Sequence, residues 1–183
     1  MTADEAAEAM AREVTSGSGA TDDAELDRFW QVARVRAKLN RLQVYFGPNA
    51  LDSLRPPAWA FGATSEQADE LLGLVLAGTK TATAGALWDY EHEGEEIPRV
   101  GDLAILLDGG GQPRALVAMT DVRVVPFDGV GAEHAYAEGE GDRSLAFWRE
   151  VHERFFTEVA THDKGFAPDM PIVCETFAVL YQT

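Results

Sequence analysis

Hydrophobic residues recur at helical spacing between residues 64 and 76, and this stretch predicts an amphipathic helix. Thr64 can cap the start of the helix, and Gln67 three residues further on completes a capping box. Gly78 follows the last apolar residue and predicts the end of the helix. The apolar positions are Ala68, Leu71, Leu72, Val75 and Leu76.

Two further segments carry helical patterns. Between residues 22 and 45, apolar positions are interspersed with basic ones, which predicts a helix packed on the body of the protein. A basic patch for RNA is the alternative, although a solvated face opposite an apolar stripe is more common. From Ser144 to about Val159 the apolar residues are too many for one stripe, so we expect burial. The apolar residues are Leu26, Phe29, Trp30, Ala33, Ala37 and Leu39 in the first segment, and Leu145, Phe147, Trp148, Val151, Phe155 and Phe156 in the second.

Three other stretches read as β-strands, at residues 103–107, 115–125 and 173–181. The glycine-rich sequence at 108–112 lies between the first two and predicts a hairpin turn.

The 183 residues suffice for one domain with a sizeable core. We expect residues 1–20 to form a flexible acidic tail, 21–54 an N-terminal helical extension and 55–183 the main domain. The tail lacks the apolar run of a secretory signal, and other apolar stretches are too short to cross a bilayer. With Cys174 as its single cysteine the chain has no internal disulfide, so we expect a cytoplasmic protein without membrane contact.

Candidate chemistry begins just past Gly78, at Lys80 and Thr83. A straight strand would send these two side chains to opposite faces, whereas a bend would bring them into one pocket. There, a buried lysine can serve as the base for a threonine hydroxyl. The alternative is a solvated lysine after a helix, followed by a strand. The segment does not match a phosphate-binding loop, because Thr79 adds one residue before the lysine and Gly73 lies inside the helix.

The segment Ala77–Thr83 resembles the signature of ASCH domains, whose fold is similar to the PUA RNA-binding domain. Further stretches resemble the larger bacterial branch of that family, and the likeness runs from about residue 55 to 181. The resemblance implies an α+β, PUA-like fold, with a small mixed β-barrel flanked by helices and here an extra N-terminal helix. These stretches are Trp59–Gly62, Ala86–Glu91, Val100–Asp102, Glu138–Leu145, Trp148–Arg149, His152, Phe155–Phe156 and Pro168–Glu175.

The resemblance also implies chemistry. Some small members of the family remove the acetyl group from N(4)-acetylcytidine with a lysine, a threonine and a glutamate; another member is a ribonuclease, and others are inferred RNA binders. Carried over to this chain, the catalytic residues fall on Lys80, Thr83 and Glu138, because His134 reproduces the setting of the glutamate. Glu140, two residues on, is the competing carboxylate. The resemblance implies no cofactor.

The charge of the chain favours some of these activities over others. There are 31 acidic residues against 15 Lys plus Arg, a net charge of −16, so a long RNA should be repelled. A free nucleoside carries no phosphate and fits better. We therefore expect a hydrolase acting on a small modified nucleoside or RNA-derived substrate, with an RNA-binding module or ribonuclease as the alternative. The sequence leaves the oligomeric state open.

Two further expectations concern the surroundings of the site. The four histidines lack a metal-ligand spacing, so we predict no metal site. Aromatic residues soon after the candidate threonine could stack on a base, although filling the core is their more common role. The residues to which we assign substrate contacts are Trp88, Tyr90, Glu140, Arg143 and Ser144.

Overall fold

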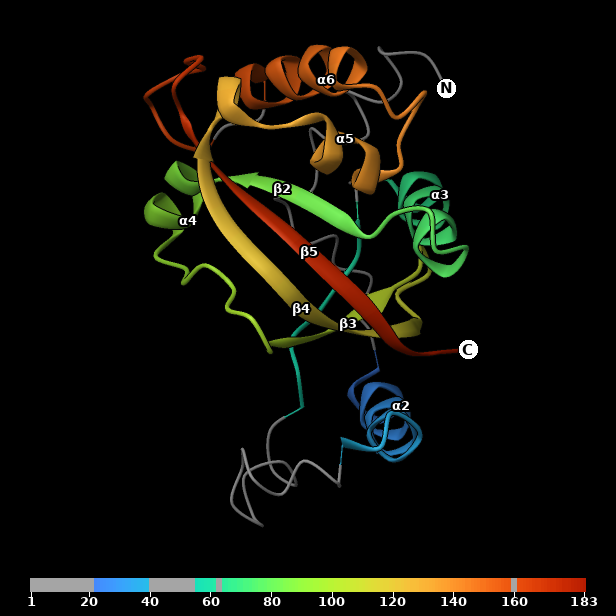
Figure 1. The fold of residues 1–183 in the computed structure, drawn as a ribbon. Helices are drawn as coiled ribbons and strands as arrows, with labels where there is room; N and C mark the ends of the chain where they lie inside the picture. Colours follow the sequence, from blue (N-terminus) through green and yellow to red (C-terminus); the bar gives the residue numbers. More distant parts are fainter. Residues whose placement is uncertain (1–21, 40–54, 62–63, 159–160) are drawn as a thin grey trace.

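The computed structural model describes residues 22–39, 55–61, 64–158 and 161–183, and these form one mixed sheet flanked by helices (Figure 1). The strand order is β1-β3-β4-β5-β2, in which β1 runs parallel to β3 and the other neighbours are antiparallel. Within this sheet β2 is an edge strand. The strands are β1 (Ala58–Trp59), β2 (Ala82–Ala86), β3 (Leu103–Leu107), β4 (Pro113–Pro126) and β5 (Pro171–Gln182).

The helices cover different parts of the sheet, as Figure 1 shows. Helices α5 and α6 lie over β2 and β5 and share a hydrophobic cluster with them. Helix α3 packs against β3, β4 and β5 through a second cluster, and α2 packs on the sheet through a third. The helices are α2 (Asp23–Arg36), α3 (Ser65–Leu76), α4 (Leu87–Glu93), α5 (Ala132–Glu138) and α6 (Leu145–Glu158), and a short 3-10 helix η2 (Phe127–Gly129) follows β4.

Side chains alternate in direction along β2 and β5, so this strand pair has two faces that pack against different parts of the protein. Ala84 lies opposite Cys174, and both belong to the cluster beneath α5 and α6. Thr83 lies opposite Glu175, and because neighbouring positions in a strand alternate, these two side chains share the other face. Phe177, two residues further along β5, packs on that face in the α3 cluster. The strand pair therefore separates two buried environments.

Most of the elements expected from the pattern are confirmed. Thr64 caps α3 through a capping box with Gln67, and the helix ends before Gly78, whose φ is 73°. The expected strands are present, each within a few residues of its predicted bounds, and α6 lies within the predicted helix. The mixed α+β fold flanked by helices is confirmed.

Helix α2 is shorter than predicted. The pattern predicted a helix as far as residue 45, but α2 ends at Arg36 and Lys38 takes a positive φ of 59°. The buried residues of α2 are Leu26, Phe29, Trp30 and Ala33, which are the positions of the predicted stripe. Residues 40–54 and the predicted tail at 1–20 lie outside the described residues.

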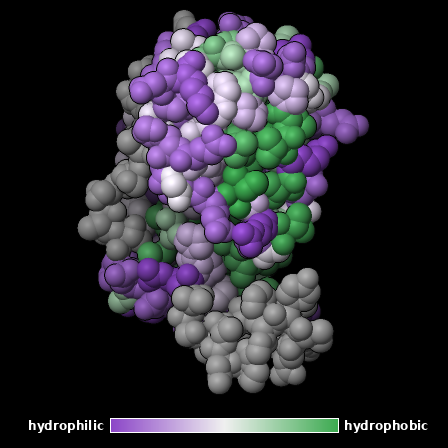
Figure 2. Space-filling model, turned by 90° about the vertical axis from the view of Figure 1, so that its left-hand side faces the viewer, coloured by the Kyte–Doolittle hydropathy of each residue, from purple (hydrophilic) through white to green (hydrophobic). Residues whose placement is uncertain are grey.

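On the face shown in Figure 2, a strip of hydrophobic residues runs between hydrophilic areas. Large hydrophobic side chains that remain exposed include Val100 and Val124. Among the described residues, no helix combines the length and the apolar character that crossing a membrane requires.

Candidate active site

Lys80 is a buried cation held between two carboxylates. Its side chain is 1% exposed, and its Nζ lies 2.6 Å from Glu140 Oε1 and 3.6 Å from Glu138 Oε2. The ammonium also lies 5.3 Å from the centre of the Phe61 ring. The alternative of a solvated lysine after the helix is therefore wrong, because this side chain is buried. Two nearby carboxylates favour the charged form of the amine.

The segment that carries both carboxylates docks against the backbone just before β2. Thr81 N donates to Ala137 O at 2.8 Å. Between the two glutamates, Gly139 has a φ of 77°, and a Cβ there would lie 2.5 Å from Thr79 O. Only glycine fits both the left-handed conformation and this close approach. The docking places Glu138 and Glu140 on either side of Lys80.

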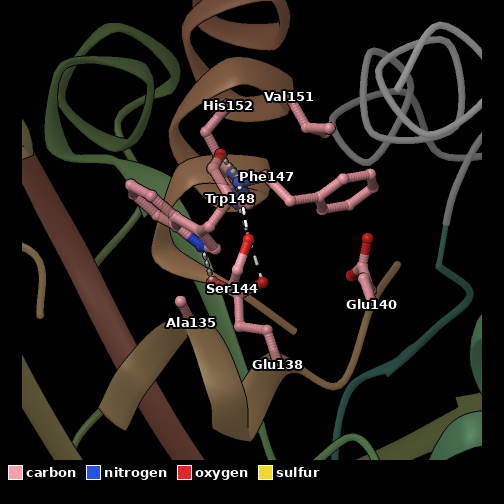
Figure 3. Close-up of a pocket in the computed structure, with 8 residues that line it drawn as sticks. All are labelled: Ala135, Glu138, Glu140, Ser144, Phe147, Trp148, Val151 and His152. Atoms are coloured by element: carbon pink, nitrogen blue, oxygen red, sulfur yellow. Dashed lines mark hydrogen bonds and ion pairs between the residues drawn. The ribbon is translucent and has the colours of Figure 1, made fainter. Parts of the chain in front are cut away.

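Glu138 is the more deeply buried carboxylate, with no exposed surface. Trp148 Nε1 donates to its Oε1 at 2.6 Å, and His134 Nε2 lies 2.9 Å from the same oxygen. His152 Nε2 lies 3.6 Å from its Oε2, while His152 Nδ1 contacts Trp148 O at 2.8 Å. Figure 3 shows Glu138 at the end of α5 directed at Trp148 and His152 on α6.

These contacts set the charges of the group. Burial would raise the pKa of Glu138, but the electrostatic influence of His152 and Lys80 and the contact with His134 hold it well below its usual range. Burial lowers the pKa of His134, yet its contacts with Cys174 and Glu138 outweigh burial and raise this pKa to about 9. Glu138 is therefore an anion at neutral pH and His134 a cation.

A small cavity of about 10 Å³ lies between the carboxylate segment and α6 (Figure 3). This is about the smallest cavity that can hold one water molecule. Glu138 and Glu140 stand on its two sides, and both Ser144 and Phe147 contribute to its wall. The cavity can therefore hold a water molecule between the two carboxylates, within the region where the chemistry is expected.

Thr83 occupies the second position of β2 and is 6% exposed. Its partner across the strands is Glu175, which accepts a hydrogen bond of 2.9 Å from the Tyr90 hydroxyl. Burial raises the pKa of Glu175, the Tyr90 hydrogen bond lowers it, and the charge of Glu138 raises it further. Lys80 lies two residues before the start of β2, outside the regular strand.

The remaining residues assigned to substrate lie in different places. Trp88 packs edge-on against His162, with ring centres 5.1 Å apart, in the cluster beneath α6. Arg143 stacks on Tyr136 at 3.6 Å and donates to Tyr136 O. Ser144 Oγ accepts from Phe147 N at 3.1 Å, which caps the start of α6. Of these, Ser144 lines the cavity, while Trp88 and Arg143 make contacts elsewhere.

Sequence reasoning used His134 only to place Glu138, and it gave no role in this network to Glu175, Trp148 or His152. One signal was available for Glu175, because it is the single acidic residue of an otherwise apolar stretch in β5. Another was the spacing of His134 and Glu138, which are four residues apart and share one helix face. Within the described residues no group of His, Cys, Asp or Glu is arranged to hold a metal ion.

Comparison with known proteins identifies the family. The ASCH domain model matches residues 57–181, and the chain belongs to the ASCH domain family. It is similar to the crystal structure of a protein of the family DUF984 from Enterococcus faecalis, with 37% identity, a TM-score of 0.70, and coverage of 85% of this chain and 88% of that one. It is also similar to an ASCH domain from Lactobacillus crispatus, with 30% identity, a TM-score of 0.66, and coverage of 81% and 96%. The comparison with curated proteins found no match.

Proposed function

We propose that this ASCH domain protein is a hydrolase that removes an acyl group from the amino group of a modified nucleoside, with N(4)-acetylcytidine as the model substrate. The observation that carries the proposal is the buried ammonium of Lys80, held by Glu140 at 2.6 Å and Glu138 at 3.6 Å. Thr83, the candidate nucleophile, is buried on the adjoining strand.

Stability alone gives little reason for such a group. Burying a charged pair costs several kcal/mol of desolvation, and apolar residues of similar size often serve as well or better. Here one lysine ammonium, two carboxylates and two histidines are brought together inside the protein. Buried clusters whose members perturb one another's pKa are typical of catalytic sites.

The geometry suggests how the proton moves. Across the 2.6 Å contact, Lys80 can pass a proton to Glu140, which leaves a neutral amine. The amine then accepts the proton of the nucleophile, either the Thr83 hydroxyl or a water molecule, as its oxygen bonds to the acyl carbon. When the carbon–nitrogen bond breaks, Lys80 returns this proton to the leaving nitrogen. After attack by Thr83, a water molecule cleaves the acyl-threonine ester in the same way and releases the carboxylic acid.

The charges favour a neutral substrate over a polynucleotide. A phosphate group would have to compete with two carboxylates for the Lys80 ammonium, so Lys80 is poorly suited to bind phosphate. The net charge of −16 disfavours association with a polyanion as a whole. The alternatives, RNA binding or RNA cleavage at the same residues, therefore have less support than hydrolysis of a free nucleoside.

The proposal is tested by incubating the purified protein with N(4)-acetylcytidine and following cytidine by chromatography. We expect turnover by the wild type and a loss of at least about 100-fold in Lys80→Met. Thr83→Val shows which nucleophile attacks the acyl carbon. Turnover is lost if the nucleophile is the Thr83 hydroxyl and is kept if it is a water molecule. Thr157→Val changes an exposed threonine of α6 and is the matched control. No turnover by the wild type, with cleavage of a single-stranded RNA that Lys80→Met lacks, would replace the proposal with a ribonuclease.

A further inference from the structure

Glu175 is a buried carboxylate to which the proposed reaction has so far given no role. It is 4% exposed, and it lies opposite Thr83 in the β2–β5 register. Cross-strand partners on one face have Cβ atoms about 4.5–5.5 Å apart, so the Glu175 and Thr83 side chains are neighbours on that face. Glu138 and His134 lie on the other side of the strand pair, where they contact α6 and Cys174.

Tyr90 connects Glu175 to the outside of the protein. Gly85 is the next residue of β2 on the Thr83 face, and a Cβ there would come within 3.2 Å of the Tyr90 ring. The missing side chain makes room for the ring, whose hydroxyl donates to Glu175 at 2.9 Å. Tyr90 also lines an open hollow of about 300 Å³ between α4 and the segment that follows it. Its lining residues are Leu87, Tyr90, Glu91, Glu95, Glu96, Ile97 and Arg99.

Lys80 reaches both faces of the strand pair, because it lies next to an edge strand. Its ammonium contacts the carboxylates of the α5 segment and also lies over Phe61. Phe61 belongs to the same hydrophobic cluster as Phe177, on the face of β5 that carries Glu175. Lys80 and the face of β5 that carries Glu175 therefore border the same hydrophobic cluster.

We propose that Glu175, held by Tyr90, is a further catalytic residue that recognises the base of the substrate and protonates it. This inference rests on the proposed function. A protonated carboxyl group presents one O–H donor and one carbonyl acceptor side by side. An N-acylated cytosine presents the complementary pair on one edge, with ring N3 as acceptor and the amide N4–H as donor. The buried position of Glu175 favours the protonated form that this pairing requires.

The pairing also has a catalytic use. When the bond between the acyl carbon and N4 breaks, its electron pair moves onto N4 and into the ring, and N3 takes the proton from Glu175. The product is the neutral imino tautomer of cytosine, and Glu175 is left as the carboxylate. N4 then takes a proton from the Lys80 ammonium and N3 returns its proton to Glu175, which gives the amino form. Because Glu175 protonates the base as the bond breaks, the leaving group departs as a neutral cytosine and not as an amide anion.

The hollow beside Tyr90 suits the entry of such a ligand. Its volume is at the lower end of the range for small-molecule sites. Leu87, Ile97 and the Tyr90 ring offer apolar surface to a base. The glutamates of the lining disfavour a phosphorylated ligand, since like charges repel. The lining therefore favours an uncharged nucleoside over a nucleotide as the ligand that enters through this hollow.

The variant Glu175→Gln separates recognition from proton transfer. Glutamine keeps an N–H donor and a carbonyl acceptor, but it cannot supply the proton. With N(4)-acetylcytidine we expect KM within about threefold of the wild type and kcat lower by about 10²–10⁴-fold. The ester p-nitrophenyl acetate has a leaving group that needs no proton, so its hydrolysis is expected to stay within about threefold. Glu153→Gln, an exposed change on α6, is the matched control.

A second measurement follows the pH dependence of turnover. The groups that act on Glu175 are Tyr90, Glu138 and His134, and the acid must be protonated to work. The ratio of amide to ester turnover by the wild type is therefore expected to fall as pH rises through the pKa of Glu175, and Glu175→Gln is expected to show a flat ratio. A Glu175→Gln protein with wild-type kcat for N(4)-acetylcytidine would overturn the inference and leave the proposed function standing. A wild type that does not turn over N(4)-acetylcytidine would overturn both.

Discussion

Two cations in this protein each lie between two carboxylates, and they differ in almost every other respect. Arg55 meets Asp27 at 2.9 Å and Asp23 at 2.8 Å, and it joins α2 to the segment before β1. Its side chain is 29% exposed, and those of Asp23 and Asp27 are 86% and 66% exposed. Lys80 has comparable contacts with Glu138 and Glu140, but it is 1% exposed.

The difference shows that the surroundings, and not the set of partners, decide what an ion pair does. Water screens the Arg55 cluster, so each charge there is nearly as stable without its partners. At Lys80 water is excluded, so each charge depends on the others and a small displacement of a proton changes the whole group. The exposed contacts of Arg55 can hold α2 against the segment before β1. The buried contacts of Lys80 can take part in proton transfer.

The largest effect is expected from removing the buried cation. Lys80→Met leaves two carboxylates facing each other in the interior, and the loss of one partner from a buried pair typically costs about 3–5 kcal/mol. We expect the free energy of unfolding at pH 7 to fall by that amount, as measured by urea denaturation. A loss of stability below about 1 kcal/mol would show that the charges around Lys80 interact as weakly as the exposed charges around Arg55.

The two carboxylates of the cluster are expected to behave differently. Glu138→Gln breaks contacts with Lys80 and two histidines, so we expect a loss of about 3–5 kcal/mol of stability. Glu140→Gln removes the carboxylate 2.6 Å from Lys80, so we expect a smaller loss of stability, about 1–3 kcal/mol, and a kcat lower by about 10²-fold or more. Denaturation and kinetics on both proteins, with the exposed Glu133→Gln as control, make the comparison. Equal losses of stability would contradict the division of roles.

The pH dependence of stability provides a third test. The pKa of His134 is raised from 6.5 to about 9, so its contribution is fully present below pH 6.5 and is lost as pH rises toward 9. This linkage amounts to about 3 kcal/mol at most, at 1.36 kcal/mol per pH unit. We expect urea denaturation of the wild type to show this decline, and His134→Gln to show a flatter curve. Parallel curves for the two proteins would mean that His134 is not a buried cation.

The smallest effect is expected at the exposed cluster. Arg55→Met removes contacts that water and salt already weaken, so we expect a loss of less than about 1 kcal/mol. The remaining difference from the wild type should shrink further in 1 M NaCl, because salt screens exposed charges. A salt-independent loss above about 2 kcal/mol would show that Arg55 supports α2 by packing rather than by charge.

Local patterns predicted the longer elements well. The capping box at Thr64, the glycine after α3 and the apolar stripe of α6 each depend on residues close together in sequence. The short helices α4 and α5 carry seven residues each, too few for a helical period to stand out. Their positions depend on contacts with the rest of the protein, such as the fit of Gly139 against Thr79.

The site was predictable in part for the same reason. The resemblance pointed to Lys80, Glu138 and Glu140, and the structure brings these three together. The β2–β5 register that sets Glu175 beside Thr83 joins segments about 90 residues apart, so no local pattern contains it. Trp88 was assigned to substrate as an aromatic near the candidate threonine, and its packing against His162 follows from the tertiary fold.

The most direct test of the account compares Lys80→Met with Arg55→Met in one assay. Each variant removes a cation from between two carboxylates, and the turnover of N(4)-acetylcytidine is measured on folded protein at pH 7. The account predicts that Lys80→Met loses at least about 100-fold in kcat/KM while Arg55→Met stays within about twofold of the wild type. Wild-type turnover in folded Lys80→Met would contradict the claim that the buried cluster is the catalytic site.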